Sequence, residues 1–220
     1  KLQVVRPWSE KESLSKEKEV LGLYLTGHPL LEFADDLEDF SNHDFSEKIN
    51  TTNSNKIRIG GSIQNFKIHY DKKNNQMAFF TLECLGGRAE ILVFSSTYAK
   101  YKEFIFEDSI VFINGKPTDN HDFTDLKLVA EEIVPLEKVR DYYAKKVNVF
   151  LDFINIDATK IEALHSLSKL YPGKCNLMFH YNDENNRKKR IISHNIQVSS
   201  SREFLTKLRD EFGKNNIWVE

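Results

Sequence analysis

The sequence has little cysteine and none of the motifs that usually carry catalysis. Its two cysteines, Cys84 and Cys175, lie far apart and form no CxxC pair. The seven histidines show no paired ligand spacing, and no serine or cysteine stands in a nucleophile motif. The two Gly-Gly pairs lack the GxxxxGK arrangement of a phosphate-binding loop. We therefore expect no catalytic residue, metal site or cofactor in this chain, and two buried thiols in a reducing compartment.

Long apolar runs are also absent. No run approaches the ~18 residues needed to cross a bilayer, and no signal peptide begins the chain. We therefore expect a soluble, cytoplasmic protein without a membrane partner. With 220 residues, of which 40% are hydrophobic and 12% aromatic, the chain has room for two small domains and a connecting segment.

A strong charge of one sign is missing as well, because the net charge is only -2. The charges are unevenly spread, however. Residues 1–55 carry 6 basic and 11 acidic side chains, residues 56–134 carry 10 and 11, and residues 135–220 carry 15 and 11. The middle of the chain thus lacks the basic excess of a tight nucleic-acid binder.

The clearest pattern in the chain is a series of strands over residues 56–134. Three strands fill residues 56–94, separated by a polar turn at residues 71–75 and by Gly86-Gly87. A short helical pattern follows at residues 95–105, and two more strands are predicted at 109–116 and 124–134. Three strands, a helix and two strands is the order of an OB-fold, a five-stranded barrel that often binds single-stranded nucleic acid on strands two and three.

Helical patterns precede this barrel. Residues 13–26 and a second stretch from Leu30 to Leu37 have apolar side chains at helical spacing, and residues 41–55 are polar. We interpret residues 1–55 as a helical connecting segment with a linker. The acidic side chains of the second helix are expected to form a solvated face: Asp35, Asp36, Glu38 and Asp39.

After the barrel we predict a bridging helix over residues 135–146 and a second domain over 147–220. The patterns of that domain follow the order strand, helix, strand, strand, helix, strand, with Ser200 and Glu203 as a capping box. This order suggests a small ferredoxin-like βαββαβ domain with a split βαβ unit. The expected fold class is therefore mixed: a short helical segment, an all-β barrel and an α+β domain.

Two strings together resemble a known family. KEKEVLGLYLTGHPL at residues 16–30, followed by MAFFTLECLGGRAEILVF at residues 77–94, is similar to the C-terminal region of the bacterial DNA polymerase III alpha subunit. An OB-fold alone would be weak evidence, because many proteins share it. A class II aminoacyl-tRNA synthetase has a barrel strand like MAFFTLEC, but it explains neither LGLYLTGHPL nor the C-terminal domain.

The resemblance implies a non-catalytic fragment of a replicative DNA-directed DNA polymerase. The parent polymerase would be a nucleotidyltransferase that needs Mg²⁺, held outside these residues. The resemblance also implies that the C-terminal domain docks the tau subunit of the clamp loader. The family's peptide for the sliding clamp has no convincing copy in residues 1–15, so we expect that contact to use sequence outside this chain.

Alternation along the second barrel strand predicts a nucleic-acid-binding face. Ala78, Phe80, Leu82 and Cys84 are assigned to the interior, and Met77, Phe79 and Thr81 to the outside. Phe79 then stands where a base could stack, although it could equally pack under the preceding helices. The candidate binding residues are Lys67, His69, Tyr70, Lys72, Lys73, Phe79 and Arg88.

Acidic residues argue against tight binding at this face. Glu83 and Glu90 are predicted on it, and residues 117–123 carry two aspartates. We therefore expect micromolar or weaker binding, and the alternative is a protein-interaction platform of the replisome that never contacts DNA. A second possible patch is the basic run of Arg187, Lys188, Lys189 and Arg190, which could meet phosphates or an acidic partner, or could simply be a solvated turn.

Overall fold

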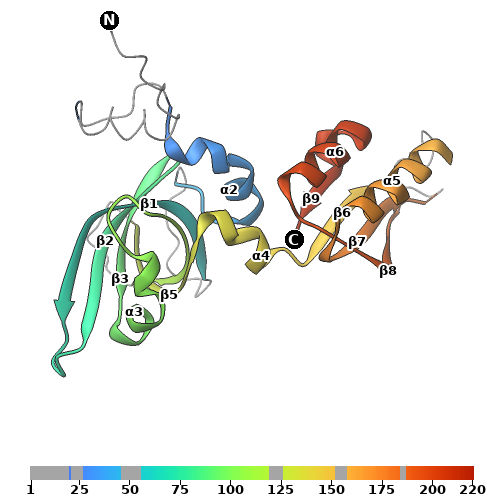
Figure 1. Ribbon diagram of the computed structural model, residues 1–220. Coiled ribbons are helices and arrows are strands. Elements are labelled where there is room, and N and C mark those ends of the chain that lie inside the picture. The colour runs from blue at the N-terminus through green and yellow to red at the C-terminus, as the bar shows by residue number, and fades with distance from the viewer. Residues whose placement is uncertain (1–19, 21–26, 46–55, 119–125, 152–157, 184–186) are drawn as a thin grey trace, which may run out of the picture. The chain divides into compact units, whose positions relative to one another are not determined.

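The computed structural model divides the chain into two compact units (Figure 1). It describes residues 20, 27–45, 56–118, 126–151, 158–183 and 187–220. The first unit takes in Lys1–Glu38 and Asn42–Leu136, and the second Asp39–Ser41 and Glu137–Glu220. Within the described ranges, no helix is long and apolar enough to cross a membrane.

The first unit contains a closed barrel with the strand order β1-β2-β3-β5-β4. Its strands are β1 (Ile57–Tyr70), β2 (Gln76–Cys84), β3 (Gly87–Val93), β4 (Ile110–Pro117) and β5 (Leu126–Pro135). Strands β3 and β5 pair in parallel, and the other neighbours pair antiparallel. Between β3 and β4 lie the helix α3 (Ser95–Tyr101) and the 3₁₀ helix η2 (Lys102–Phe104). The predicted OB-fold is therefore confirmed.

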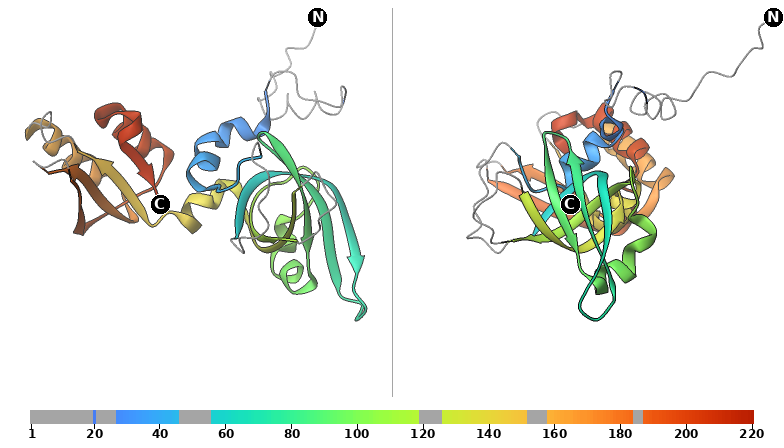
Figure 2. Two further views of the ribbon diagram at one scale, coloured as in Figure 1. Left: turned by 180° about the vertical axis from the view of Figure 1, so that it is seen from behind. Right: turned by 90° about the vertical axis from the view of Figure 1, so that its left-hand side faces the viewer.

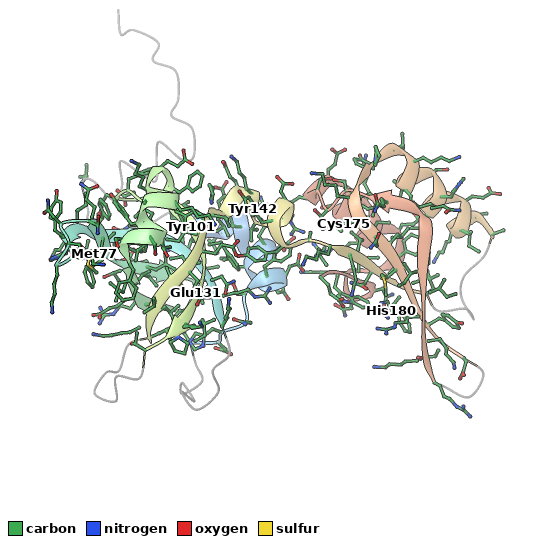
Figure 3. All side chains as sticks on the ribbon, turned by 90° about the horizontal axis from the view of Figure 1, so that it is seen from below. Met77, Tyr101, Glu131, Tyr142, Cys175 and His180 are labelled. Atoms are coloured by element: carbon green, nitrogen blue, oxygen red, sulfur yellow. The ribbon has the colours of Figure 1, made fainter. Side chains whose placement is uncertain are left out.

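The barrel core follows from alternation along its strands. Ala78, Phe80 and Leu82 of β2 are at most 4% exposed, whereas Phe79 between them lies outside. Tyr98 and Tyr101 of α3 pack into the same core, and Figure 3 labels Tyr101. The predicted interior and exterior of β2 are thus confirmed for these residues, and a packed core supports the outer face.

A bulge bends β1 at its middle. The register with β2 shifts between Gln64 and Lys67, and Asn65 has a φ of 55°. The Glu107 carboxylate fixes this bend by accepting hydrogen bonds from the backbone N–H groups of Asn65 and Phe66, both at 2.9 Å. Beyond the bulge, β1 and β2 continue as a hairpin that projects from the barrel (Figures 1 and 2). The bulge therefore sets the direction of the side chains that follow it.

Two of the barrel glycines occupy positions that exclude other residues. A Cβ on Gly61 would lie 2.4 Å from the carbonyl oxygen of Glu83, so β1 and β2 approach more closely there than a side chain permits. Gly86 adopts a φ of +91° in the turn between β2 and β3. The prediction of a turn glycine is confirmed at Gly86, while Gly61 lies within β1.

The residues before the barrel form a 3₁₀ helix, η1 (Pro29–Phe33), and the helix α2 (Ala34–Phe40). Leu30 and Leu37 are buried, as the helical pattern predicted. The helix predicted over residues 13–26 lies outside the described residues, apart from the helical residue Val20. Most of the predicted linker over residues 41–55 lies outside them as well, but the Asn42 side chain binds the backbone of Lys56 and Arg58.

The predicted solvated acidic face of α2 is wrong at two positions. Asp36 is only 2% exposed. The side chain of Asp39 is 10% exposed and forms ion pairs with Arg140 at 3.0 Å and Arg209 at 3.9 Å. Both arginines lie more than 100 residues away along the chain. Two cations therefore offset the cost of burying this carboxylate.

The second unit is a four-stranded sheet with two helices. Its elements are η3 (Leu136–Lys138), α4 (Val139–Tyr143), β6 (Lys146–Phe150), α5 (Ala158–Leu170), β7 (Pro172–Asn182), β8 (Lys188–Val198), α6 (Arg202–Phe212), η4 (Lys214–Asn216) and β9 (Ile217–Val219). Leu136 itself is counted with the first unit. Ser201 caps α6 by accepting the N–H of Phe204, one residue later than the predicted capping box.

The strand order of this sheet corrects the ferredoxin-like prediction. The element order βαββαβ is as predicted, but the strands are arranged β8-β7-β6-β9. A split βαβ unit would place β8 between β6 and β7, whereas here β6 and β7 pair directly and in parallel. The start of β8 carries Lys188, Lys189 and Arg190, all exposed. Such charges suit an edge strand and would be costly in the middle of a sheet.

Candidate nucleic-acid interface

A groove crosses the outer face of the barrel on β1, β2, β3 and β5. Strand pairing places Lys67, Phe79 and Leu92 in one row across the sheet, and Thr81, Glu90 and Lys127 in the next. The groove has a volume of about 440 Å³. It is lined by these six residues together with Asn65, Phe80, Ile91, Thr118 and Leu128.

Phe79 is the aromatic side chain at the centre of this face. It is 38% exposed, so the described helices leave it uncovered. The ring of His69 meets it edge-on, with centroids 5.0 Å apart and planes at 82°. This contact fixes the orientation of the Phe79 ring while leaving a surface on which a base can stack, a contact worth about 1 to 3 kcal/mol where it occurs.

The turn between β1 and β2 carries the remaining residues predicted from this hairpin. Tyr70 is 61% exposed, and Lys72 and Lys73 are exposed in the turn itself. One carboxylate oxygen of Asp71 accepts the backbone N–H groups of Lys73 and Asn75, both at 2.8 Å. The hydrogen bond from the backbone of Asn75 is the main reason that the pKa of Asp71 lies below its usual value. The two lysines are therefore presented by an ordered turn.

Arg88 does not line the groove. It lies on β3 directly opposite Glu83, two positions further along the outer face than the Thr81–Glu90 pair. Its side chain is exposed and also interacts within the chain. Of the predicted binding residues, the structure thus brings Lys67, His69 and Phe79 together, places Tyr70, Lys72 and Lys73 at the tip of the same hairpin, and separates Arg88.

Lys127 is a groove residue that the sequence reasoning missed. It reaches the site because β5 pairs in parallel with β3, which puts Lys127 opposite Glu90. The two side chains form an ion pair at 2.6 Å. The buried Leu126 and Leu128 on either side were a usable signal, since alternation from them places Lys127 on the outer face.

Other basic residues of the barrel are engaged elsewhere. Lys56 and Lys116 both bind the carboxylate of Glu131 at 2.7 Å, and Figure 3 labels Glu131. Both lysines donate hydrogen bonds that lower the pKa of Glu131, and the bond from Lys116 has the larger effect. The positive charge available to a ligand in the groove therefore comes chiefly from Lys67 and from the hairpin lysines.

Comparison with known proteins finds similarity first for the barrel and then along the whole chain. Residues 57–136 match a family model described as an OB-fold nucleic acid binding domain. The DNA polymerase III subunit alpha of Borreliella burgdorferi is 26% identical over 225 residues, which cover 99% of this chain and 19% of that protein. The chain is homologous to the C-terminal region of DNA polymerase III alpha subunits.

Two further alpha subunits show the same similarity to this chain. The Pseudomonas aeruginosa and Escherichia coli K12 subunits are each 26% identical over 98% of this chain. The chain spans about a fifth of the length of these relatives, 18% and 19% respectively. A mitochondrial single-stranded DNA binding protein from S. cerevisiae matches 37% of this chain and 93% of its own, with 19% identity and a TM-score of 0.31.

The predicted basic run, residues 187–190, lies at the start of β8 and includes the residue just before it. Lys188, Lys189 and Arg190 are exposed, and Lys189 lies 3.9 Å from the Asp183 carboxylate. The backbone N–H of Arg187 donates to the same carboxylate at 2.8 Å. Because side chains alternate along a strand, the run divides between the two faces of the sheet instead of forming one patch.

Metal-binding and thiol chemistry receive no support from the described residues. Within them, no group of three His, Cys, Asp or Glu side chains could hold a metal ion. Cys84 and Cys175 are both free thiols. Burial raises the pKa of Cys84 to about 12, so this thiol stays protonated and unreactive.

Proposed function

We propose that this chain is the non-catalytic C-terminal part of a replicative DNA polymerase, and that its barrel holds single-stranded DNA weakly in the groove around Phe79. The homology to DNA polymerase III alpha subunits and the OB-fold family match support this assignment. The parent chain would act in the cytoplasm as a Mg²⁺-dependent nucleotidyltransferase, with its active site outside these residues.

One observation carries the proposal for the groove: an uncovered aromatic ring lies in register with a lysine. Phe79 pairs directly with Lys67 across β1 and β2. A base stacked on Phe79 would thus have its phosphate within reach of a cation, while Lys72 and Lys73 extend the basic line along the projecting hairpin. Stacking accepts every base, so binding should show little sequence preference.

The affinity should be micromolar or weaker at physiological salt. Glu90 lies in the groove and holds Lys127 at 2.6 Å, so one of the groove's two lysines is already neutralised. A strand must compete with this carboxylate for the cation. Binding should weaken steeply as salt rises, because phosphate contacts release counterions.

A labelled single-stranded oligonucleotide tests the proposal. Phe79→Ala should weaken binding by about 1 to 3 kcal/mol. Phe106→Ala is the matched control, because Phe106 is 56% exposed and does not line the groove. A folded Phe79→Ala protein that binds as tightly as the unaltered chain would remove this role for the groove.

The second candidate is a protein-interaction platform of the replisome that makes no DNA contact. The nearly balanced charge of residues 56–134 and the Glu90–Lys127 pair favour it. The salt series separates the two candidates. If no oligonucleotide binds even at low salt while a replisome protein does, the platform is the correct reading.

We also propose that the second unit docks the tau subunit of the clamp loader, and that contact with the sliding clamp uses sequence outside this chain. The family resemblance supports this proposal, and the exposed side chains from Arg187 to Arg190 supply positive charge on both sides of an edge strand for an acidic partner. Replacing all four basic residues with serine should weaken tau binding in a pull-down. Unchanged binding of both tau and DNA would mean that the run is only a solvated turn.

A further inference from the structure

Among the residues that the structure describes, one face of the second unit's sheet carries no helix. Figures 1 and 2 show α5 and α6 on the same side of the sheet. This follows from topology: the connections β6–α5–β7 and β8–α6–β9 both join parallel strands, and right-handed crossovers in this strand order put both helices on one side. Val147 and Val149 of β6 pair with Leu177 of β7 and with Val219 and Ile217 of β9, all buried, and we assign this apolar side to the helices, whose Phe204, Leu205 and Leu208 are buried as well. Asn148 between the two valines then points to the other side. We call that other side the open face.

Strand register assigns the residues of the open face. Asn148 pairs with Met178 on β7 and with Trp218 on β9, and His180 follows Met178 by two positions. On the edge strand, Arg190 pairs with His180, and Lys188 follows on the same face. The open face thus carries the rings of His180, Trp218 and the half-buried Phe150, the amide of Asn148, and the basic side chains of Lys146, Arg190 and Lys188. It also carries two aliphatic side chains, the buried Met178 and Ile192, which is 43% exposed on the edge strand.

The rings of His180 and Trp218 form a pair in the middle of this face. Their centroids are 4.8 Å apart and their planes meet at 44°. Both rings are partly exposed. His180 Nε2 hydrogen-bonds Asn148 Oδ1 at 2.9 Å, and Trp218 Nε1 donates to Glu220 Oε1 at 3.2 Å. These bonds hold both rings in place and leave ring surface facing outwards.

Asn148 lies beneath the ring pair with an unused donor. Its side chain is fully buried, and within the described residues its Nδ2 makes no hydrogen bond. A buried amide without a partner is uncommon, because it loses water without a replacement. A ligand that tilts the rings would give this donor an acceptor.

The charges around the ring pair favour an anionic ligand. Glu220 is the acidic side chain in contact with the pair, and Lys146 already balances it at 3.2 Å. Arg190 and Lys188 remain at the edge, about 6.6 Å apart along the strand for residues two positions apart. This spacing suits successive phosphates of an extended single strand. Ile192 is an exposed aliphatic side chain on this face, but it lies on the edge strand beside the buried Met178 and not on the ring pair. Rings next to basic side chains fit a base and its phosphates better than the apolar side of a partner helix.

We propose that the open face is a second binding site for single-stranded nucleic acid, independent of the barrel groove. One base stacks on the Trp218–His180 ring pair, and the adjoining phosphates contact Arg190 and Lys188. Open sheets with aromatic side chains bind bases in this way in other proteins.

Tryptophan fluorescence tests this site directly. The sequence has two tryptophans, so Trp8→Phe leaves Trp218 as the only one. Phe79→Ala and Lys67→Ser are added to weaken the barrel groove. In this full-length variant, a short oligothymidylate at low salt should quench Trp218 as a base stacks on it. An absence of quenching, or quenching that occurs only while the groove is intact, would overturn the proposal.

Charge variants in the same background identify the phosphate contacts. Arg190→Ser with Lys188→Ser should lower affinity about ten-fold and reduce the slope of log affinity against log salt by about 1.4. Lys169→Ser is the control, since Lys169 is exposed on α5, on the helix side. Equal losses in the control and the double variant would overturn the site.

Two further measurements separate a base from any other anion. By anisotropy of a labelled oligonucleotide, Trp218→Leu should bind about ten-fold more weakly, whereas Tyr142→Leu, which changes an aromatic residue 54% exposed on α4, should not differ. Thermal unfolding confirms that each variant is folded. If a polyglutamate peptide quenches Trp218 as well as the oligonucleotide does, the ligand is an acidic protein segment and the nucleic-acid assignment is wrong.

Discussion

The barrel groove and the open face of the C-terminal sheet place similar residues on different supports. Each has an aromatic contact, Phe79 with His69 or Trp218 with His180, next to basic side chains. The groove is concave and contains a carboxylate of its own, Glu90, paired with a lysine. The open face is one side of a four-stranded open sheet, and its basic residues Arg190 and Lys188 are on an edge strand. The comparison indicates that the closed barrel offers a ligand a shaped groove, whereas the open sheet offers a surface that a ligand can approach from one side.

The largest expected effect tests whether the two surfaces depend on separate cores. Leu82 is fully buried in the barrel and Leu177 is 1% exposed in the C-terminal sheet. Each change to alanine should lower the free energy of unfolding of its own unit by about 2 to 5 kcal/mol. Leu82→Ala should also weaken oligonucleotide binding by the groove, whereas Leu177→Ala should spare it. Denaturant unfolding and binding assays check both, and loss of groove binding in Leu177→Ala would show that the units are coupled.

The next effect tests the carboxylate that lies within the groove. Glu90→Gln removes a negative charge and releases Lys127 from its ion pair. Affinity of the groove for single-stranded DNA should rise by about 1 kcal/mol, the energy of two unit charges a few ångströms apart in water. Glu83→Gln is the matched control, because Glu83 is an exposed residue on the same strand face but outside the groove lining. A lower affinity in Glu90→Gln would mean that the ion pair organises the site instead of restricting it.

A third, smaller effect distinguishes the surfaces by pH. Burial lowers the pKa of His180; Glu220 opposes the shift, and Arg190 and Lys146 reinforce it. The unfolded chain therefore binds this proton more readily than the folded one. Stability that is present above the unfolded pKa near 6.5 should be lost as pH falls through the lower folded pKa. Unfolding of the second unit between pH 7 and pH 5 should show this loss, and His180→Gln should reduce it. An unchanged pH profile in that variant would contradict the assignment.

Local patterns in the sequence were sufficient where a structure depends on neighbours along the chain. Alternation on β2 correctly placed Phe79 outside and Leu82 inside, because side chains of a strand alternate whatever lies beside it. The hairpin of β1 and β2 was also predictable, because its two strands and the polar turn between them are neighbours along the chain. The order of elements in both units followed from the periods of their apolar residues.

Patterns failed where distant segments meet. Alternation does not state which strand lies beside which, so the sheet order β8-β7-β6-β9 was not predictable from it. Lys127 was missed because its place in the groove depends on the parallel pairing of β3 with β5. Asp39 was expected in solvent because Arg140 and Arg209, which bury it, are remote in the sequence.

The smallest expected effect concerns Arg88, which the sequence placed with the groove residues. Lys67→Ser removes a cation beside Phe79 and should reduce the salt slope of oligonucleotide binding by about 0.7, the value for one phosphate contact with a single strand. Arg88→Ser removes the same charge two positions beyond the groove, opposite Glu83, and should leave the slope almost unchanged. Titrations at several salt concentrations measure both. Equal salt slopes for the two variants would mean that the bound DNA strand runs past Thr81 towards the β2–β3 turn. The binding face would then extend beyond the groove along the whole of β2 and β3.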